Sequence, residues 1–467
     1  MVAPSRDDPF VTAASQAVGG PVGRHARPHP FWTPLRLVLA LVTLAGVLNL
    51  VHTAPCQAGA WWSGAAYADL CYSDVPLGYV PHGHAEGVAP YEDTGGRYAR
   101  ATEPAPVAAV AVAAAWVARA LSGGGSTGAE VSARADVPVA ELATQEAVQE
   151  EALAFYGVYA LVMLVCALAL GALLVGLSGR RPFDAAAFAV APVLVASATV
   201  GWDLLGAALA VGAVYAWSRR RPVAYGVLLG TAVAAASWPV AVAVAMVALA
   251  VRAGRTRPVL GAVVGAASVW ALWQLPVLLL APEVWWGTVN RTLDGGIGYG
   301  SLWRLGSSFG LSISSGRLVA LVVVALALVT VAVLGLALSA PAPRLPQVVL
   351  LLLVGGLLVW PVYSPQYVLW LLPFAVLARP RWRDLLWWQA GEICYFLAVW
   401  WTLSGATVDA GSADKPYTVA IVVRVVAELW LAGVVVRDIL EPERDPARAE
   451  PASASAGSPR SAVGGLR

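Results

Sequence analysis

The sequence is poor in charged residues. Only 12% of its 467 residues are Asp, Glu, Lys or Arg, about half of the share that a soluble domain carries. Lysine is almost absent, because Lys415 is the only one. By contrast, 59% of the chain is hydrophobic. So little polar surface excludes a set of ordinary soluble domains, and we expect an integral membrane protein.

Residue patterns typical of several other protein classes are also missing. The chain has four cysteines, no Cys-x-x-Cys and no Cys/His cluster, so we expect no metal site and no cofactor. It has no Walker A sequence, and no duplicated acidic pair suggests a sugar-nucleotide site with a metal ion. We expect no nucleic-acid partner. Cys166 and Cys394 lie in apolar runs, whereas Cys56 and Cys71 share a polar loop and are a possible disulfide pair.

Long apolar runs are abundant, and a spanning helix needs about 20 such residues. We expect a membrane domain over residues 34–437, between disordered cytoplasmic ends at 1–33 and 438–467. The first run is too long for a signal-peptide core and is interpreted as a retained helix. The runs lie at 34–53, 153–177, 184–200, 203–217, 223–251, 258–281, 317–340, 346–361, 365–379, 384–403 and 417–437.

Arginine clusters set the expected orientation. Arg24 and Arg27 precede the first run and Arg36 lies at its start, which predicts a cytoplasmic N-terminus. The later clusters share that side only if the run 223–251 forms two segments that turn near Pro239, where proline breaks a helix. The sequence then predicts an all-α polytopic protein of about 12 spans (range about 10–13), with both ends cytoplasmic. These clusters are Arg180/Arg181, Arg219–Arg221, Arg252/Arg255/Arg257, Arg344 and Arg379/Arg381/Arg383.

Three polar stretches then lie outside the cytoplasm, at 54–152, 282–316 and 404–416. Within the first, 107–121 is apolar but too short to cross the bilayer. We expect it to be an interfacial or re-entrant helix. The following stretch, 122–151, is rich in Gly, Ser and Glu and is expected to be a flexible linker.

The first external loop contains most of the candidate chemistry. It reads Cys71-Tyr-Ser-Asp74-Val-Pro, then Pro81-His-Gly-His-Ala-Glu-Gly87, then Pro90-Tyr-Glu-Asp93. Carboxylates near a bilayer are costly and tend to have a role. Composition alone favours the simpler interpretation, which is a solvated loop rich in turn residues.

The order of the motifs resembles that of polyprenyl-phosphate-dependent glycosyltransferases of the GT-C fold. The best match is glycosyltransferase family 87, which includes mannosyltransferases and arabinofuranosyltransferases. Gly201-Trp-Asp203 with Trp238-Pro239 looks like its middle helical pair and following turn. Tyr363-Ser-Pro-Gln-Tyr-Val-Leu-Trp-Leu-Leu-Pro373 looks like its late segment. Two positions depart from the family: Ala236 replaces a frequent lysine, and Glu103-Pro104 lacks the usual intervening tyrosine.

The resemblance implies a membrane glycosyltransferase that transfers a sugar with inversion. The donor is a polyprenyl-phosphate sugar, with mannose the first choice and arabinofuranose the second. The acceptor is a cell-envelope glycolipid or polysaccharide, and the site faces the extracytoplasmic side of a bacterial plasma membrane. Asp74 matches the general base of that family. A lipid phosphate is already a good leaving group, so no metal ion is required.

Further candidates are assigned around Asp74. For the donor phosphate they are Arg291, Arg304, Gln366 and Tyr367. For the sugar or acceptor they are Tyr72, His82, His84, Tyr91, Asp93, Glu103, Asp203 and Trp238. Each has a simpler interpretation: the arginines contact lipid headgroups, the histidines lie on the surface, Asp203 caps a helix, and the aromatics anchor at the interface.

Two other classes of protein stay open. A lipid or solute transporter or flippase predicts internal repeats and ionisable residues within the spans. No clear repeat is visible, and Glu392, Arg424 and Glu428 are the main charges inside apolar runs. A non-catalytic membrane scaffold is the third class, which the departure at Ala236 keeps open.

Overall fold

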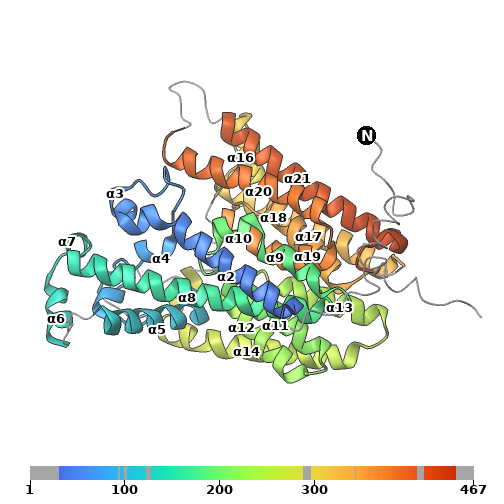
Figure 1. Ribbon diagram of the computed structural model, residues 1–467, viewed down its shortest axis with the longest axis horizontal. Helices are drawn as coiled ribbons and strands as arrows, with labels where there is room; N and C mark the ends of the chain where they lie inside the picture. Colours follow the sequence, from blue (N-terminus) through green and yellow to red (C-terminus); the bar gives the residue numbers. More distant parts are fainter. Residues whose placement is uncertain are drawn as a thin grey trace, which may run out of the picture.

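The computed structural model describes residues 31–92, 95–98, 103–122, 128–287, 296–341, 343–406 and 415–448. Its regular secondary structure is entirely helical over these residues (Figure 1). Five helices are long and apolar enough to cross a membrane: α2 (Pro34–His52), α8 (Glu146–Leu177), α14 (Thr256–Leu280), α17 (Ser315–Ser339) and α21 (Lys415–Leu440). The bundle also contains α20 (Trp382–Leu403), which has 22 residues. Shorter helices complete it: α5 (Ala105–Leu121), α11 (Asp203–Ser218), α12 (Pro222–Ala235), α13 (Val240–Arg252), α18 (Leu345–Val359) and α19 (Val368–Ala378).

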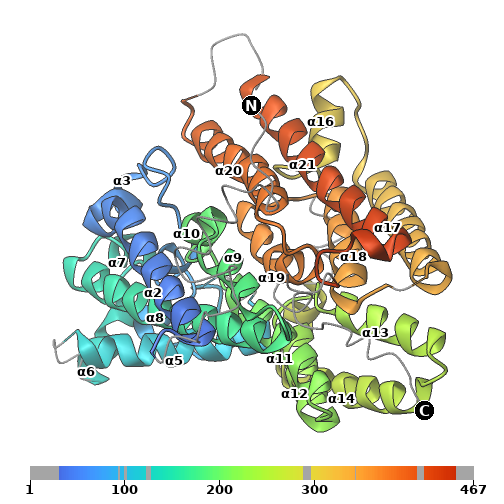
Figure 2. The same ribbon diagram turned by 45° about the vertical axis from the view of Figure 1, so that its right-hand side comes forward.

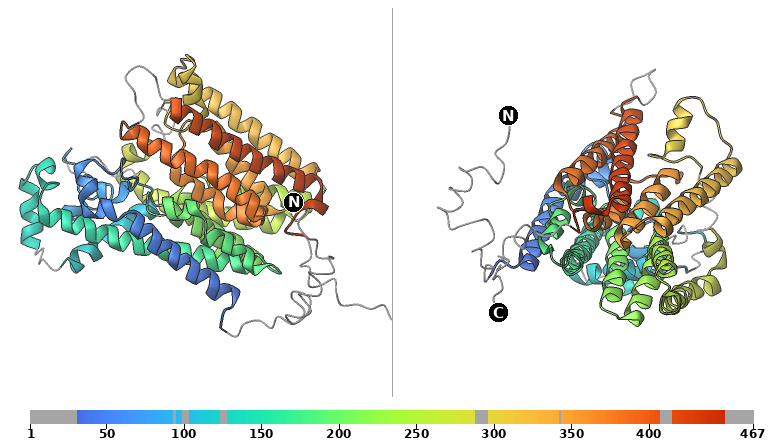
Figure 3. Two further views of the ribbon diagram at one scale, coloured as in Figure 1. Left: turned by 45° about the horizontal axis from the view of Figure 1, so that its top comes forward. Right: turned by 90° about the vertical axis from the view of Figure 1, so that its right-hand side faces the viewer.

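The outer surface of the bundle suits lipid rather than water. On α17, Leu321, Val324, Leu328 and Val331 are all exposed, and the most apolar 18-residue stretch of this helix has a mean hydropathy of 3.0. A soluble monomer rarely exposes an apolar face of this extent. The long helices run in a broadly common direction (Figure 3), as helices that cross one bilayer must. The described chain is therefore a helical membrane protein.

The helix breaks predicted from proline and glycine are present. α12 ends at Ala235 and α13 begins at Val240, so the run 223–251 is two helices. A second break separates α10 (Pro192–Ser197) from α11, with Gly201 between them. A third precedes η5 (Pro365–Tyr367), which leads into α19. Each break exposes backbone groups that a continuous helix would satisfy internally.

Two expectations were wrong. The run 184–200 is not one helix, because Pro192 cannot extend α9 (Ala186–Ala189) and starts α10 instead. The stretch expected to be a flexible linker contains α6 (Gly128–Ala133), η3 (Arg134–Asp136) and α7 (Val139–Leu142). Arg134 orders it by forming an ion pair of 2.7 Å with Glu151, which is 4% exposed. Composition does not reveal such a partner.

The elements of the first loop gather at one end of the bundle, where Figure 1 shows α3 (Trp61–Ser63), α4 (Asp74–Leu77), α6 and α7. α5 packs along α8 through small side chains, since Ala111, Ala114 and Ala118 are buried. Figure 2 shows that α17, α18, α20 and α21 form a second group beside α2, α5 and α8.

Several arginine clusters meet at one place. Arg181 Nη1 donates to the Pro446 carbonyl at 2.8 Å. Arg344 pairs with the neighbouring Asp445 at 2.7 Å. α8 (Glu146–Leu177) separates this region from the loop, because Glu151 in its second turn accepts a hydrogen bond from Tyr79 of the loop, whereas its other end, Leu177, lies next to Arg180 and Arg181 in the sequence. Its 32 residues span about 48 Å. The arginine-rich segments and the first loop thus lie at opposite ends.

We expect Arg379→Met to lower the free energy of unfolding by about 3–5 kcal/mol. Arg379 is fully buried and binds Asp384 at 2.7 Å and Asp438 at 2.5 Å, so its loss leaves two buried carboxylates without their shared partner. Arg383→Met is the matched control, because Arg383 also binds Asp384 but its side chain is 70% exposed. That change is expected to cost less than about 1 kcal/mol. Unfolding in detergent measures both, and equal losses would contradict the prediction.

Candidate functional site

Asp74 is fixed in place by three local interactions. The structure has a disulfide between Cys56 and Cys71, which closes a loop with a sequence separation of 15. A closed loop of this length stabilises a fold by about 3 kcal/mol in the chain-entropy model. Ser73 caps α4 by accepting a hydrogen bond from Val75 N at 3.4 Å. The Asp74 amide donates to the Val200 carbonyl at 3.0 Å, which ties the loop to the turn before α11.

Two of the predicted turns, the one at Gly201 and the one at Gln366, lie close to Asp74. A Cβ atom placed on Gly201 would lie 2.9 Å from Asp203 Oδ2, 3.6 Å from Gln366 Nε2 and 3.9 Å from Asp74 Oδ2. A side chain at this position would displace the Asp203 carboxylate. Residues far apart in the sequence thus bring two carboxylates and an amide within 4 Å of one point.

The Asp74 carboxylate opens into a cavity whose walls limit its hydration. Tyr72 Oη donates to Asp74 Oδ1 at 2.7 Å. Burial raises the pKa of Asp74, and the Tyr72 hydrogen bond and the charge of His82 oppose that rise. Burial and the adjacent carboxylate also raise the pKa of Tyr72, so its hydroxyl stays a donor. Asp74 is therefore a stronger base than an exposed aspartate, as proton abstraction requires.

Asp203 is held by an aromatic stack from other helices. Trp370 Nε1 donates to Asp203 Oδ1 at 2.7 Å. The Trp370 ring stacks on Tyr367 at 3.9 Å and on Trp238 at 5.8 Å. Asp203 is not a helix cap, contrary to one interpretation of the sequence, because the N-cap residue of α11 is Trp202. Asp203, Tyr367 and Trp238 thus form a supporting layer beside Asp74.

The cavity at Asp74 has a volume of about 260 Å³. Gln366 and Ser364 line it with Asp74, together with several aromatic side chains. Tyr67 stacks on Tyr72 at 4.7 Å and on Trp400 at 5.8 Å. Rings with a polar tip can contact the C–H face and the hydroxyls of a sugar. The aromatic residues that line the cavity are Tyr67, Tyr72, Tyr299, Tyr363 and Trp400.

Sequence reasoning missed several of these side chains. Tyr67 lies in the first loop, and its place shortly before Asp74 is the only signal that it gives. Trp400 gives none, because it is one of 20 tryptophans and lies inside an apolar helix. Trp370 was part of the recognised late segment, but its bond to Asp203 was not predicted.

One of the two candidate arginines lies near the cavity. Arg304 is on α16 (Leu302–Ser308), which Ser301 caps. Its guanidinium carbon lies 5.8 Å from the ring centroid of Tyr299, a residue of the cavity wall. Arg291 and the candidate Asp93 lie outside the residues that the structure describes.

The remaining candidates form a separate group. His82 Nδ1 lies 2.6 Å from Glu103 Oε1, and Tyr91 Oη donates to the Glu103 carbonyl at 2.7 Å. Burial lowers the pKa of His84 to about 4, so this ring is neutral at pH 7. His82, His84 and Glu103 line a cavity of about 10 Å³, which has room for one water at most. They support the loop beside α4 and do not line the cavity at Asp74.

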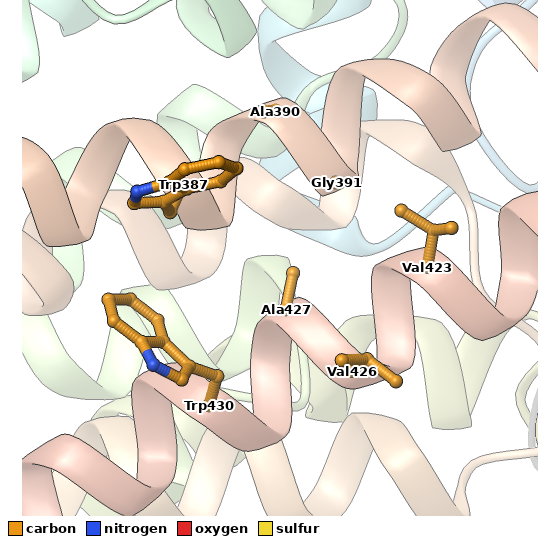
Figure 4. A pocket seen from close by; sticks show the side chains of 7 residues that line it. All are labelled: Trp387, Ala390, Gly391, Val423, Val426, Ala427 and Trp430. Carbon is orange, nitrogen blue, oxygen red and sulfur yellow. The ribbon is translucent and has the colours of Figure 1, made fainter.

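A larger cavity, of about 410 Å³, has no such chemistry. It is a groove between α20 and α21 in which Trp387 and Trp430 lie one above the other (Figure 4). Its other lining residues are alanine, glycine and valine. We interpret it as part of the lipid-facing surface, because no acid, base or nucleophile lines it.

Asp74, Gln366 and Tyr72 therefore form the candidate site, with Asp203 beside it and Arg304 near the Tyr299 wall. Among the described residues, no group of three or more His, Cys, Asp or Glu side chains is placed to hold a metal ion. Comparisons with protein-family models, curated proteins and solved structures find no match.

We expect Tyr72→Phe to raise the pKa of Asp74. The Tyr72 hydroxyl stabilises the ionised carboxylate, so without it the proton is held to a higher pH. Carbodiimide reacts with protonated carboxyl groups, and mass spectrometry of Asp74 modification against pH reports this shift. The half-modification pH should rise in Tyr72→Phe and stay unchanged in Tyr67→Phe, which alters a stacked neighbour. A fall in that pH in Tyr72→Phe would show that the sign is wrong.

Proposed function

We propose that this protein is a membrane glycosyltransferase with a GT-C-like arrangement of twelve spans. It transfers a sugar from a polyprenyl-phosphate donor to a cell-envelope glycolipid or polysaccharide acceptor, with Asp74 as general base. The observation that carries the proposal is the convergence of Asp74, Asp203 and Gln366 at one point. These three residues come from the three separate segments that carry the family resemblance.

The proposed orientation places the site on the extracytoplasmic side of a bacterial plasma membrane. A disulfide such as Cys56–Cys71 forms and persists in an oxidising compartment. The arginine-rich segments lie at the other end of the bundle, where the positive-inside rule expects the cytoplasm. Both termini are then cytoplasmic.

In the proposed reaction, Asp74 removes the proton from an acceptor hydroxyl while its oxygen attacks the anomeric carbon of the donor sugar. The new glycosidic C–O bond forms as the bond from that carbon to the phosphate oxygen breaks. The lipid phosphate leaves with the electron pair, and the configuration at the anomeric carbon inverts. The raised pKa of Asp74 increases its affinity for the transferred proton.

The departing phosphate needs positive charge and hydrogen-bond donors. Arg304 supplies the charge near the Tyr299 wall, and the Gln366 amide supplies a donor. Ala236, the C-cap residue of α12, stands where the resembling family often has lysine. We therefore assign the phosphate contact to Arg304 in this chain.

The cavity favours a small sugar. Its volume of about 260 Å³ is just below the range of about 300–1,000 Å³ typical of small-molecule sites. It suits a single sugar unit, with mannose the first choice and arabinofuranose the second. The rest of the donor is a hydrocarbon chain, which the surrounding bilayer solvates.

A transporter or flippase is the second candidate function. Arg424, Glu392 and Glu428 lie buried within α20 and α21, and ionisable residues inside spans often mark transport pathways. Transport of a lipid or solute does not need Asp74 to act as a base.

The test is transfer activity in membranes that contain the Asp74→Asn variant. The membranes are supplied with radiolabelled polyprenyl-phosphate mannose and, separately, with polyprenyl-phosphate arabinofuranose. Loss of the base should lower the transfer rate by about 10²–10⁴-fold. Asp69→Asn is the matched control, because Asp69 is an exposed aspartate of the same loop and should keep its activity.

Full activity of Asp74→Asn would exclude Asp74 as the base. If wild-type membranes move a labelled lipid or solute but transfer no sugar, the transporter replaces the enzyme as the proposed function.

A further inference from the structure

Three ionisable side chains lie in the middle of two membrane helices and are not part of the cavity wall. Arg424 and Glu428 belong to α21, and Glu392 belongs to α20. Their exposed fractions are 0%, 0% and 3%, respectively. Charges buried in a membrane protein are costly and are usually functional. The proposed glycosyl transfer gives them no role.

The charges of this cluster balance only if it holds one proton. Arg424 Nη1 pairs with Glu428 Oε1 at 2.9 Å, so one guanidinium offsets one carboxylate. Glu392 lies within hydrogen-bonding reach of Glu428. Glu428 Oε2 has no donor among the other described side chains. Two carboxylates this close cannot both be ionised away from water, so one proton sits between them.

The cluster holds two segments that form a wall of the cavity. Arg424 Nη2 donates to the Gly300 carbonyl at 3.0 Å. Its guanidinium carbon lies 3.6 Å from the ring centroid of Tyr363, a cation–π contact. The Tyr363 hydroxyl donates to Glu392 Oε2 at 2.8 Å. Every member of the cluster except Glu428 therefore binds a wall segment directly.

The two wall segments are also joined to each other. Gly298 N donates to Pro361 O and Tyr363 N donates to Tyr299 O, both at 2.8 Å. At Gly300 φ is +72°, and a Cβ there would lie 2.1 Å from the Tyr395 hydroxyl oxygen. Segments 298–300 and 361–363 are thus one clamped unit. Gln366 lies three residues beyond it.

We propose that Glu392, Glu428 and Arg424 form a neutral, proton-sharing cluster that positions segments 298–300 and 361–366. Through them it sets the place of the Gln366 amide beside Asp74. These three are positioning residues, since none lines the cavity. The effect on catalysis rests on the proposed function, whereas the effect on the wall rests on the contacts alone.

The test uses the purified full-length chain in lipid nanodiscs and hydrogen–deuterium exchange read by mass spectrometry. In Arg424→Gln, peptides covering 298–300 and 361–366 should exchange about tenfold faster than in wild type, while α2 and α8 stay unchanged. Transfer of the sugar should fall about 10²-fold in kcat/KM.

Two further variants serve as a second test and as a control. Tyr363→Phe removes only the hydroxyl that binds Glu392. It should speed exchange in the same peptides even if Arg424→Gln does not fold. Glu428→Gln is the conservative control, because its amide oxygen can accept the hydrogen bond from Arg424 and its amide N–H can donate to Glu392. Its exchange and activity should stay within about twofold of wild type.

Unchanged exchange in both Arg424→Gln and Tyr363→Phe would overturn the proposal, and so would faster exchange spread evenly over all helices. If Glu428→Gln does as much harm as Arg424→Gln, the cluster needs an ionised Glu428 and no proton is shared. Should the wild-type protein transfer no sugar, the exchange results still decide whether the cluster positions the wall.

Discussion

Backbone polar groups cannot reach water inside a bilayer, and this constraint shapes the whole structure. A continuous helix satisfies them internally, so each break in a membrane helix needs partners for the groups that it frees. Here the breaks near Gly201 and Gln366 lie beside the first loop, and Asp74 N donates to Val200 O. The segments that satisfy one another's backbone are also those that carry the polar side chains. The site is a consequence of where the helices stop.

The same logic explains why charge is concentrated at a few places. The Arg379 cluster at one end, the Arg134–Glu151 pair in the loop and the Arg424 cluster within the spans all pair buried opposite charges. Each joins helices or loops whose apolar surfaces could pack equally well against lipid, because lipid tails are as apolar as leucine. In this account, packing builds the bundle, and the polar contacts fix how its parts are aligned. Asp74 depends on that alignment because its neighbours come from distant segments.

The sequence predicted the helical class, most helix positions and the breaks, because long apolar runs and proline act locally. It also predicted Asp74, Asp203 and Gln366 through ordered motifs, and the structure brings these three together. It did not predict that Trp400 lines the cavity. It also did not predict the segmented helices at 184–200 and 128–142. Trp400 reaches the cavity only through the packing of α20, and the order at Arg134 depends on a partner 17 residues away. Contacts of that kind are tertiary and leave no local pattern.

The proposed mechanism requires that the loop carrying Asp74 faces away from the cytoplasm. Labelling of single engineered cysteines in intact cells with a membrane-impermeant maleimide tests it most directly, using Glu92→Cys in the exposed part of that loop and Arg219→Cys in an exposed turn at the arginine-rich end. Position 92 should react in intact cells, whereas position 219 should react only after the membrane is permeabilised. The reverse pattern would place Asp74 in the cytoplasm and would contradict both the orientation and the mechanism.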